Sequence, residues 1–360
     1  MEKSKSSLSF ASSTSLSPEA EMENAIWQEK YLVEDEYVWT LSEDLKEVAR
    51  LEVGETEEVR NEGLAYMREF IREDSRLTYC RRDANFLLRF LRMKKFNLEA
   101  AKETLEKYLR MRAEIPEWYQ NLDINDPALN DIVSSGCTIV LPERDSHGRK
   151  VLFHCAKMFD LSKYGAADLI RAHILNFETA LEDEENQIRG FTYIFDFKEV
   201  SIPYISVWTP TQFHKVVSQG ERFLPMRHQA VNLVNQPMGF FLIYEFAKHV
   251  LSEKIRSRIN LYRSDKSMKK LLPQQCIPLE YGGLVSLKEM GRQWRDVLVE
   301  KRESVAGLDR MIVEFEAAHL KLNKKSSSWV SLSRWFSSRQ KSVAATNDDV
   351  KAEWNSARFK

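Results

Sequence analysis

The side chains that could perform chemistry in this sequence are few and widely separated. Asp196 ends an apolar, strand-like segment, where catalytic carboxylates occur, but no second carboxylate or nucleophile lies near it in sequence. His173 and His214 lie in apolar helical segments, and we interpret both as core or cavity groups rather than metal ligands. Glu178 and Glu182 are one helical turn apart, and we interpret them as a solvated helix face.

The recurring sequence signatures of catalysis are absent. The sequence contains no G-x-S-x-G, G-x-G-x-x-G or G-x-x-x-x-G-K-[ST] motif. Its seven histidines never stand four residues apart, so no helix carries a metal-binding pair. We therefore expect that the protein is not an enzyme and that it has no catalytic residues, no metal site and no cofactor.

Composition limits the remaining classes of function. A net charge of −1 argues against a protein that binds nucleic acid with its whole surface, so a basic function must be a local patch. The apolar runs are far shorter than the roughly 18 residues that a membrane span needs, and the Ser-rich start lacks the apolar centre of a signal peptide. The cysteines have no metal or redox spacing; they are Cys80, Cys137, Cys155 and Cys276. We expect a cytoplasmic protein whose membrane contact is peripheral.

Changes in residue pattern along the chain divide it into five parts. Residues 1–40 are expected to be a mostly disordered extension, and residues 41–126 a small all-helical module. Residues 127–285 alternate strand-like and helical segments, which predicts an α/β domain with a mainly parallel sheet. The expected strands cover residues 137–141, 151–155, 191–197, 229–234 and 258–262. Residues 286–322 read as helical, and residues 323–360 as a flexible basic and aromatic tail.

One stretch, residues 235–259, combines an apolar helix with a basic end. Apolar residues recur at helical spacing up to Leu251, and Lys254 and Arg258 then stand one turn apart, with Arg256 nearby. Such a helix can be an ordinary core helix with a solvated end, or it can cover an apolar cavity and meet an anionic surface. Large aromatic residues are abundant in this half of the chain, and they too suit either a packed core or a cavity wall.

Several of these segments, taken in order, resemble the CRAL-TRIO lipid-binding family. The resemblance is greatest to its branch of alpha-tocopherol transfer protein, cellular retinaldehyde-binding protein and clavesins, and it runs from about Asp83 to Gly283. The segments that carry it are Phe86-Leu-Leu-Arg-Phe-Leu-Arg92, Asp145 to Lys150, Phe195-Asp196, Asn232 to Pro237, Leu251-Ser-Glu-Lys-Ile-Arg256 and Pro278-Leu-Glu-Tyr-Gly-Gly283.

The resemblance implies an α/β bowl with a mainly parallel sheet as its floor and a helical lid, preceded by the helical module. A single hydrophobic lipid would lie inside. The cavity positions that the resemblance implies are Ile170, His173, Phe177, Phe191, Phe195, Trp208, Val216, Leu224, Met226 and Val231. The lid positions are Phe240, Tyr244, Phe246 and Leu251.

The same branch implies a phosphoinositide-binding patch beside the lid, at Lys94, Arg227, Lys254 and Arg258. We therefore expect a monomeric carrier that exchanges a tocopherol-, retinoid- or other isoprenoid-like lipid at endosomal or other phosphoinositide-containing membranes. Two alternatives stay open. One is a phosphoinositide-binding scaffold, and the other is a phosphatidylinositol-type phospholipid transfer protein without isoprenoid cargo.

Overall fold

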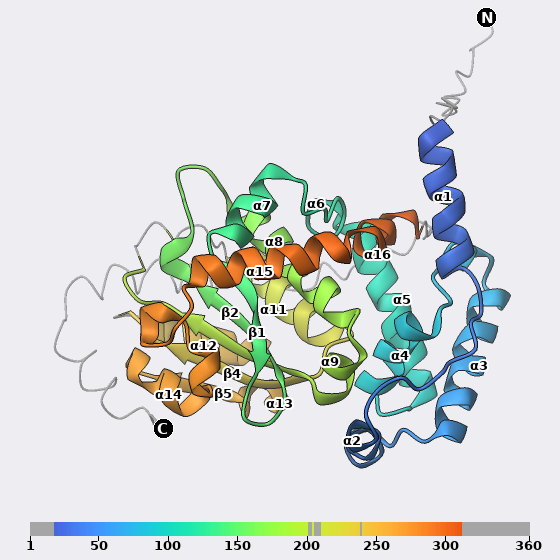
Figure 1. Cartoon of the computed structure of the whole chain (residues 1–360), viewed down its shortest axis with the longest axis horizontal. Coiled ribbons are helices and arrows are strands. Elements are labelled where there is room, and N and C mark those ends of the chain that lie inside the picture. Colours follow the sequence, from blue (N-terminus) through green and yellow to red (C-terminus); the bar gives the residue numbers. More distant parts are fainter. Residues whose placement is uncertain (1–17, 201–203, 205–209, 238–239, 312–360) are drawn as a thin grey trace, which may run out of the picture.

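A computed structural model describes residues 18–200, 204, 210–237 and 240–311, which form a helical front part and an α/β part (Figure 1). The strands lie in the order β1-β2-β3-β4-β5. β1 and β2 form an antiparallel hairpin, and every later strand is parallel to its neighbour. Their bounds are β1 Thr138–Arg144, β2 Lys150–Cys155, β3 Phe191–Asp196, β4 His228–Val234 and β5 Ile259–Tyr262. The predicted α/β fold with a mainly parallel sheet and a preceding helical module is confirmed.

The front part is built from helices with well-defined starts. Asp83 accepts the amide hydrogen of Phe86 at 3.1 Å and so caps α4, and Asn97 caps α5 through the amide of Ala100 at 3.0 Å. Two short helices begin with a proline, at Pro116 and at Pro127. The helices before the sheet are α1 Pro18–Tyr31, α2 Glu43–Val53, α3 Glu57–Glu73, α4 Ala84–Met93, α5 Leu98–Glu114, α6 Pro116–Tyr119 and α7 Pro127–Ser134.

Helices connect the parallel strands, as crossover connections require. α8 and α9 lead from β2 to β3, α11 leads to β4, and α12 with α13 leads to β5. After the sheet, α15 packs against β1 and α7 (Figure 1). The bounds are α8 Ala166–Leu181, α9 Glu184–Arg189, α11 Pro210–Arg222, α12 Phe240–Val250, α13 Glu253–Arg256, α14 Met268–Leu271, α15 Leu287–Glu300 and α16 Arg302–Ala306.

The N-terminal extension departs from its prediction. We expected residues 1–40 to be mostly disordered, but within them α1 is a regular helix at the outer end of the front part (Figure 1). Its Trp27 is fully buried beside Gly307, where a Cβ atom added to the glycine would lie 2.1 Å from the indole nitrogen. This burial across a long sequence separation fixes α1, and no local pattern in the acidic sequence reveals it. Residues 1–17 and the predicted tail at 323–360 lie outside the described residues.

Side chains alternate between the two faces of the sheet. We call one of them the inner face; its members are Leu152, His154, Tyr193, Phe195, Val231, Leu233, Ile259 and Leu261, which are paired across the strands. On the other face, Phe153 packs against Tyr281 with ring centroids 5.6 Å apart, and Ile194 and Val234 are fully buried. The outer side is therefore closely packed.

Candidate functional site

On the inner face, the side chains of the middle strands are less completely buried than their central position in the sheet would suggest. Phe195, Val231 and Leu233 keep accessible surface, although they lie on the two middle parallel strands. All four residues of the neighbouring β5 are also only partly buried. A parallel sheet covered by helices normally buries such positions. The apolar floor therefore retains surface that protein atoms do not cover.

Two histidines indicate where this uncovered surface lies. His173 on α8 and His228 on β4 are only half-buried, yet burial lowers the pKa of each to about 4. Burial has this effect because an imidazolium that is removed from bulk water loses its hydration. The side chains between α8 and the inner face are therefore partly accessible and at the same time largely removed from solvent, and this region is the candidate ligand site.

The predicted cavity positions fall into two groups. His173, Phe177 and Phe195 lie together, with ring centroids 5.9 Å apart for His173 and Phe177 and 6.2 Å for His173 and Phe195. Val216 and Val231 are likewise partly buried and pack against the same core. These five keep accessible surface, and we call them the accessible group.

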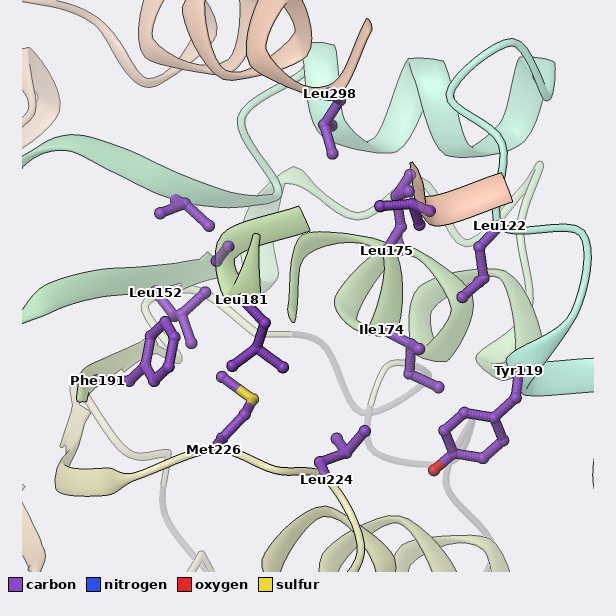
Figure 2. Packing of buried hydrophobic residues seen from close by; sticks show 14 of the residues in the cluster. Tyr119, Leu122, Leu152, Ile174, Leu175, Leu181, Phe191, Leu224, Met226 and Leu298 are labelled. Carbon is purple, nitrogen blue, oxygen red and sulfur yellow. The ribbon is translucent and has the colours of Figure 1, made fainter. Parts of the chain in front are cut away.

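The second group belongs to the packed core. Phe191, Leu224 and Met226 are at most 2% exposed, and Ile170 is 3% exposed. Figure 2 shows Leu224 pointing toward Ile174 and Met226 toward Leu181, both on α8. These four predicted positions are closely packed in this structure, and their role in a cavity stays a prediction. Trp208 lies outside the described residues.

The helix predicted to be the lid is α12, which packs against α11. Phe240 is 8% exposed, and its ring lies 5.1 Å from that of Phe197. Tyr244 is half-buried beneath the ammonium group of Lys248, 4.8 Å from the ring centroid. Leu251 is half-buried at the end of the helix, and the side chain of Phe246 lies outside the described residues.

The end of α12 and the strand before it are both anchored. The backbone amide of Ser252 donates to Glu221 on α11 at 3.0 Å. Before the helix, the side-chain amide of Asn235 donates to Asp196 at 2.7 Å, and the hydroxyl of Tyr281 donates to the other oxygen of Asp196. Asp196 is 1% exposed, so its role is to clamp the end of β3 to the segment that leads into α12.

The four predicted phosphoinositide-binding residues are brought together in a larger group of cations. Its members come from the α4–α5 loop, the β1–β2 turn, the start of β4 and the region of α13. We call it the cation cluster; it comprises Lys94, Lys95, Arg149, Arg227, Lys254 and Arg258.

The members of the cation cluster repel one another. Burial lowers the pKa of Lys254, and the charges of Arg258, Lys95 and Arg227 lower it further. Burial likewise lowers the pKa of Lys94 and of Arg258, with Lys254 adding to the effect at Lys94 and Arg149 at Arg258. Such mutual destabilisation is relieved when an anion binds.

Few acidic groups compensate this charge. Arg227 donates to Glu52 at 2.9 Å, while its other terminal nitrogen, Nη1, is buried without a hydrogen-bond partner. Arg258 donates to the backbone carbonyl of His228. Within the part of the chain that the structure describes, Lys94, Lys254 and Arg258 form no ion pair. The cluster therefore offers both charge and free donors to an anion.

Sequence reasoning missed Lys95 and Arg149. Lys95 adjoins Lys94 in the α4–α5 loop and has a left-handed backbone, with φ of 51°. Arg149 follows the glycine of the β1–β2 turn. Neither position belongs to a periodic element, and the available signal was only their adjacency to segments already singled out. Their proximity to the other cations depends on the tertiary fold.

The prediction of a solvated face at Glu178 and Glu182 is wrong. Glu178 is fully buried and accepts from Arg89 at 3.2 Å and from the Tyr108 hydroxyl at 2.8 Å. Glu182 accepts from Arg89 at 2.7 Å and from Arg81 at 3.0 Å. The arginines of the α4 segment thus cross to α8, and this buried network attaches the front part to the α/β part.

A separate open depression of about 610 Å³ lies between α4, the α8–α9 corner, β1 and α15, and it contains none of the predicted cavity residues. Asn85, Glu182 and Glu184 in its wall are already hydrogen-bonded within the protein. We assign no ligand to it. Among the described residues, no cluster of His, Cys, Asp or Glu could hold a metal ion, and no helix is long and apolar enough to cross a membrane.

Comparisons with known proteins agree with this architecture. The CRAL/TRIO domain profile matches residues 134–283, and the profile of a Pinta-like UBA domain matches residues 56–129. Clavesin-1 of Xenopus laevis is 32% identical over 259 residues, which is 72% of this chain and 78% of the relative. An alpha-tocopherol transfer protein-like protein of Mus musculus is 35% identical over 268 residues, covering 74% of this chain and 77% of the relative.

Among solved structures, the crystal structure of Sfh5 superposes with a TM-score of 0.43 and 16% sequence identity, covering 73% of this chain and all of that one. This likeness is too remote to inform function. The profile match over the sheet and the identity to long relatives are sufficient by themselves: the chain belongs to the CRAL-TRIO family.

Proposed function

We propose that this protein carries one hydrophobic lipid, of tocopherol, retinoid or other isoprenoid type, between the inner face and α12, and exchanges it at phosphoinositide-containing membranes. Its relatives support lipid binding or transfer as the general activity. The observation that carries the finer proposal is the uncovered apolar floor: Phe195 and Val231 keep surface, and the half-buried His173 has its pKa lowered to about 4 by burial. A bound apolar molecule would cover this surface.

The sizes of the energetic terms favour exchange at a membrane over release into water. Burial of roughly 400 Å² of apolar ligand surface at about 25 cal/mol/Å² stabilises the complex by about 10 kcal/mol before ordering costs. A lipid that is bound this strongly dissociates only slowly into water. It leaves faster when α12 moves aside and the opening faces lipid.

The cation cluster supplies the attraction to the membrane. Each cation near an anionic leaflet contributes about 1 kcal/mol, so the four residues predicted from the sequence together contribute about 4 kcal/mol, or roughly a thousandfold in residence. Because Arg258 and Lys254 follow α12 closely in sequence, anion binding there can bias the position of α12. In this proposal, phosphoinositide binding couples cargo release to the identity of a cytoplasmic membrane.

Reversal of one exposed charge tests the membrane step. Lys254→Glu is the cleanest change because Lys254 is exposed and forms no ion pair with described residues. Two charge units are lost, so transfer of a fluorescent tocopherol to phosphoinositide vesicles should slow by about thirtyfold, while lipid uptake stays unchanged. Lys270→Glu on α14, equally exposed but outside the cation cluster, is the matched control.

Three results would contradict parts of the proposal. Equal transfer rates for Lys254→Glu and Lys270→Glu would remove the role of the cation cluster. Mass spectrometry of lipids extracted from the purified chain tests the cargo, and finding no bound lipid would favour the scaffold alternative. Finding a bound phosphatidylinositol instead would favour the phospholipid-transfer alternative.

A further inference from the structure

The apolar wall of the proposed cavity contains one polar spot, formed by His154 on β2 and His173 on α8. Their ring centroids are 5.0 Å apart, and Phe195 lies 5.8 Å from His154 and 6.2 Å from His173. Aromatic surface thus surrounds two adjacent imidazoles. An inference drawn from this spot rests on the proposed carrier function and specifies its cargo.

A chain of hydrogen bonds fixes the orientation of the groups behind His173. The indole nitrogen of Trp294 can only donate, and it lies 2.7 Å from Oδ1 of Asn176. This contact identifies the carbonyl side of the Asn176 amide. The amide nitrogen then donates to the backbone carbonyl of Thr138 at 3.0 Å and to its hydroxyl oxygen at 3.3 Å.

The same chain determines which nitrogen of His173 carries the proton. The Thr138 hydroxyl lies 3.0 Å from Nδ1 of His173, and its other contact, the Asn176 amide nitrogen, can only donate. Among the described residues, Nδ1 is therefore the acceptor available to the hydroxyl hydrogen. Nδ1 therefore accepts, and in the neutral ring the proton resides on Nε2. Burial keeps the ring neutral, since it lowers the pKa of His173 to about 4. No described residue is hydrogen-bonded to this Nε2, and the side chain keeps accessible surface.

The neighbouring ring of His154, with its centroid 5.0 Å from that of His173, supplies a second nitrogen without a partner. Its Nε2 is 2.7 Å from the hydroxyl of Tyr204, whereas Nδ1 is buried without a partner, on a side chain that is 2% exposed. A buried nitrogen without a partner is costly unless a ligand or water satisfies it. The other histidine of the wall needs no such partner. His228 is bonded to Tyr193 at 2.7 Å through Nδ1 and to the carbonyl of Gly220 at 3.0 Å through Nε2.

We propose that the His154–His173 pair binds the oxygen atom of an oxygenated lipid, which accepts a hydrogen bond from Nε2–H of His173. A hydroxyl group fits best, because it can also exchange a hydrogen bond with Nδ1 of His154. The rest of the cargo is apolar and lies against Phe177 and Phe195. The pair therefore selects an isoprenoid alcohol over the hydrocarbon with the same skeleton.

Two matched lipids test this selectivity in the full-length protein. Phosphatidylcholine vesicles that contain equal amounts of phytanol and phytane are incubated with the protein, the protein is separated, and both lipids are quantified by gas chromatography. The ratio of phytanol to phytane taken up by the wild type, divided by the ratio for His173→Phe, cancels the preference of the donor membrane. This double ratio should be about ten, because one hydrogen bond to a desolvated donor is lost.

Two further variants separate hydrogen bonding from shape. His173→Gln keeps an N–H donor and should restore part of the preference for phytanol. Phe177→Leu, one turn along α8, removes apolar contact with the cargo but no polar group. It should lower the uptake of both lipids alike, so its double ratio should stay near one. If His173→Phe no longer takes up phytane, the comparison of His173→Gln with Phe177→Leu carries the test.

The outcomes are distinct. A double ratio near one for His173→Phe, with phytane still taken up, would overturn the oxygen site but leave the carrier function intact. A lack of uptake of either lipid by the wild type would overturn the carrier function, and the oxygen site with it.

Discussion

The buried network between α4 and α8 makes a quantitative prediction about how the two parts of the protein hold together. In Glu182→Gln, the acceptor of two guanidinium groups, Arg81 and Arg89, becomes a neutral amide at a position that is nearly inaccessible to water. Removal of one partner from a buried ion pair costs about 3–5 kcal/mol, since the other charges stay buried. We expect the free energy of unfolding in urea to fall by that amount at about pH 7.

The pH dependence identifies the origin of this loss. Burial alone would raise the pKa of Glu182, but Arg81 and Arg89 lower it from 4.5 to about 2. A lowered folded-state pKa gives stability that is complete above about pH 4.5 and is lost as the pH falls toward about 2. The shift corresponds to roughly 3 kcal/mol at neutral pH. The difference between wild type and Glu182→Gln should therefore shrink by about 1 kcal/mol between pH 7 and pH 4.

Glu47→Gln is the matched control, because Glu47 pairs with Arg50 on the exposed side of α2. It should change the unfolding free energy far less than Glu182→Gln does. A difference between wild type and Glu182→Gln that is the same at both pH values would refute the ionic account and leave shape as the cause. A loss no larger than that of Glu47→Gln would show that the network does not hold the two parts together.

Two other substitutions test contacts described above. Gly307→Ala places a methyl group against the indole of Trp27. We expect the free energy of unfolding in urea to fall by about 1–3 kcal/mol and proteolysis between α1 and α2 to become faster. Unchanged proteolysis would show that α1 is not held there. Tyr281→Phe removes the hydroxyl that donates to the buried Asp196, and should lower the free energy of unfolding by about 1.5–3 kcal/mol, whereas Tyr79→Phe at an exposed position should not; equal effects would remove the clamp.

The sequence predicted the elements of the sheet well because their signals are local. The aromatic and β-branched run at residues 191–197 corresponds to β3 at Phe191–Asp196, and the run at residues 229–234 to β4 at His228–Val234. The five strands and their connecting helices are sufficient to predict a mainly parallel sheet. The resemblance to the CRAL-TRIO family is confirmed by the comparisons.

Errors arose where partners lie far apart in sequence. Glu178 looks like a surface residue in its own helix, and only α4, about 90 residues earlier, supplies the arginine that buries it. Trp27 lies within the extension that was predicted to be mostly disordered, although Gly307, near the end of the described chain, accommodates its indole.

The division of the cavity positions could not be predicted from residue type. Phe191 and Phe195 are the same residue on the same face of one strand, yet Phe191 is fully buried and Phe195 keeps accessible surface. The difference depends on which side chains of α8 and of the segment before β4 reach across to each position. The alternation of residues along a strand specifies the face on which a side chain lies, but not how completely other side chains cover it.

In the proposed carrier, the hydrogen bonds of Asp196 would separate the residues that set lipid affinity from those that set the rate of lipid exchange. Because Asn235 is held to the end of β3, the movement of α12 that we propose would pivot after this residue and would leave the register of the strands unchanged. Substitutions on the strands should then alter the affinity for the bound lipid. Substitutions at the other end of α12, where the amide of Ser252 donates to Glu221, should alter how often α12 moves aside. In the proposed mechanism, lipid occupancy and the rate of lipid exchange would thus depend on different residues.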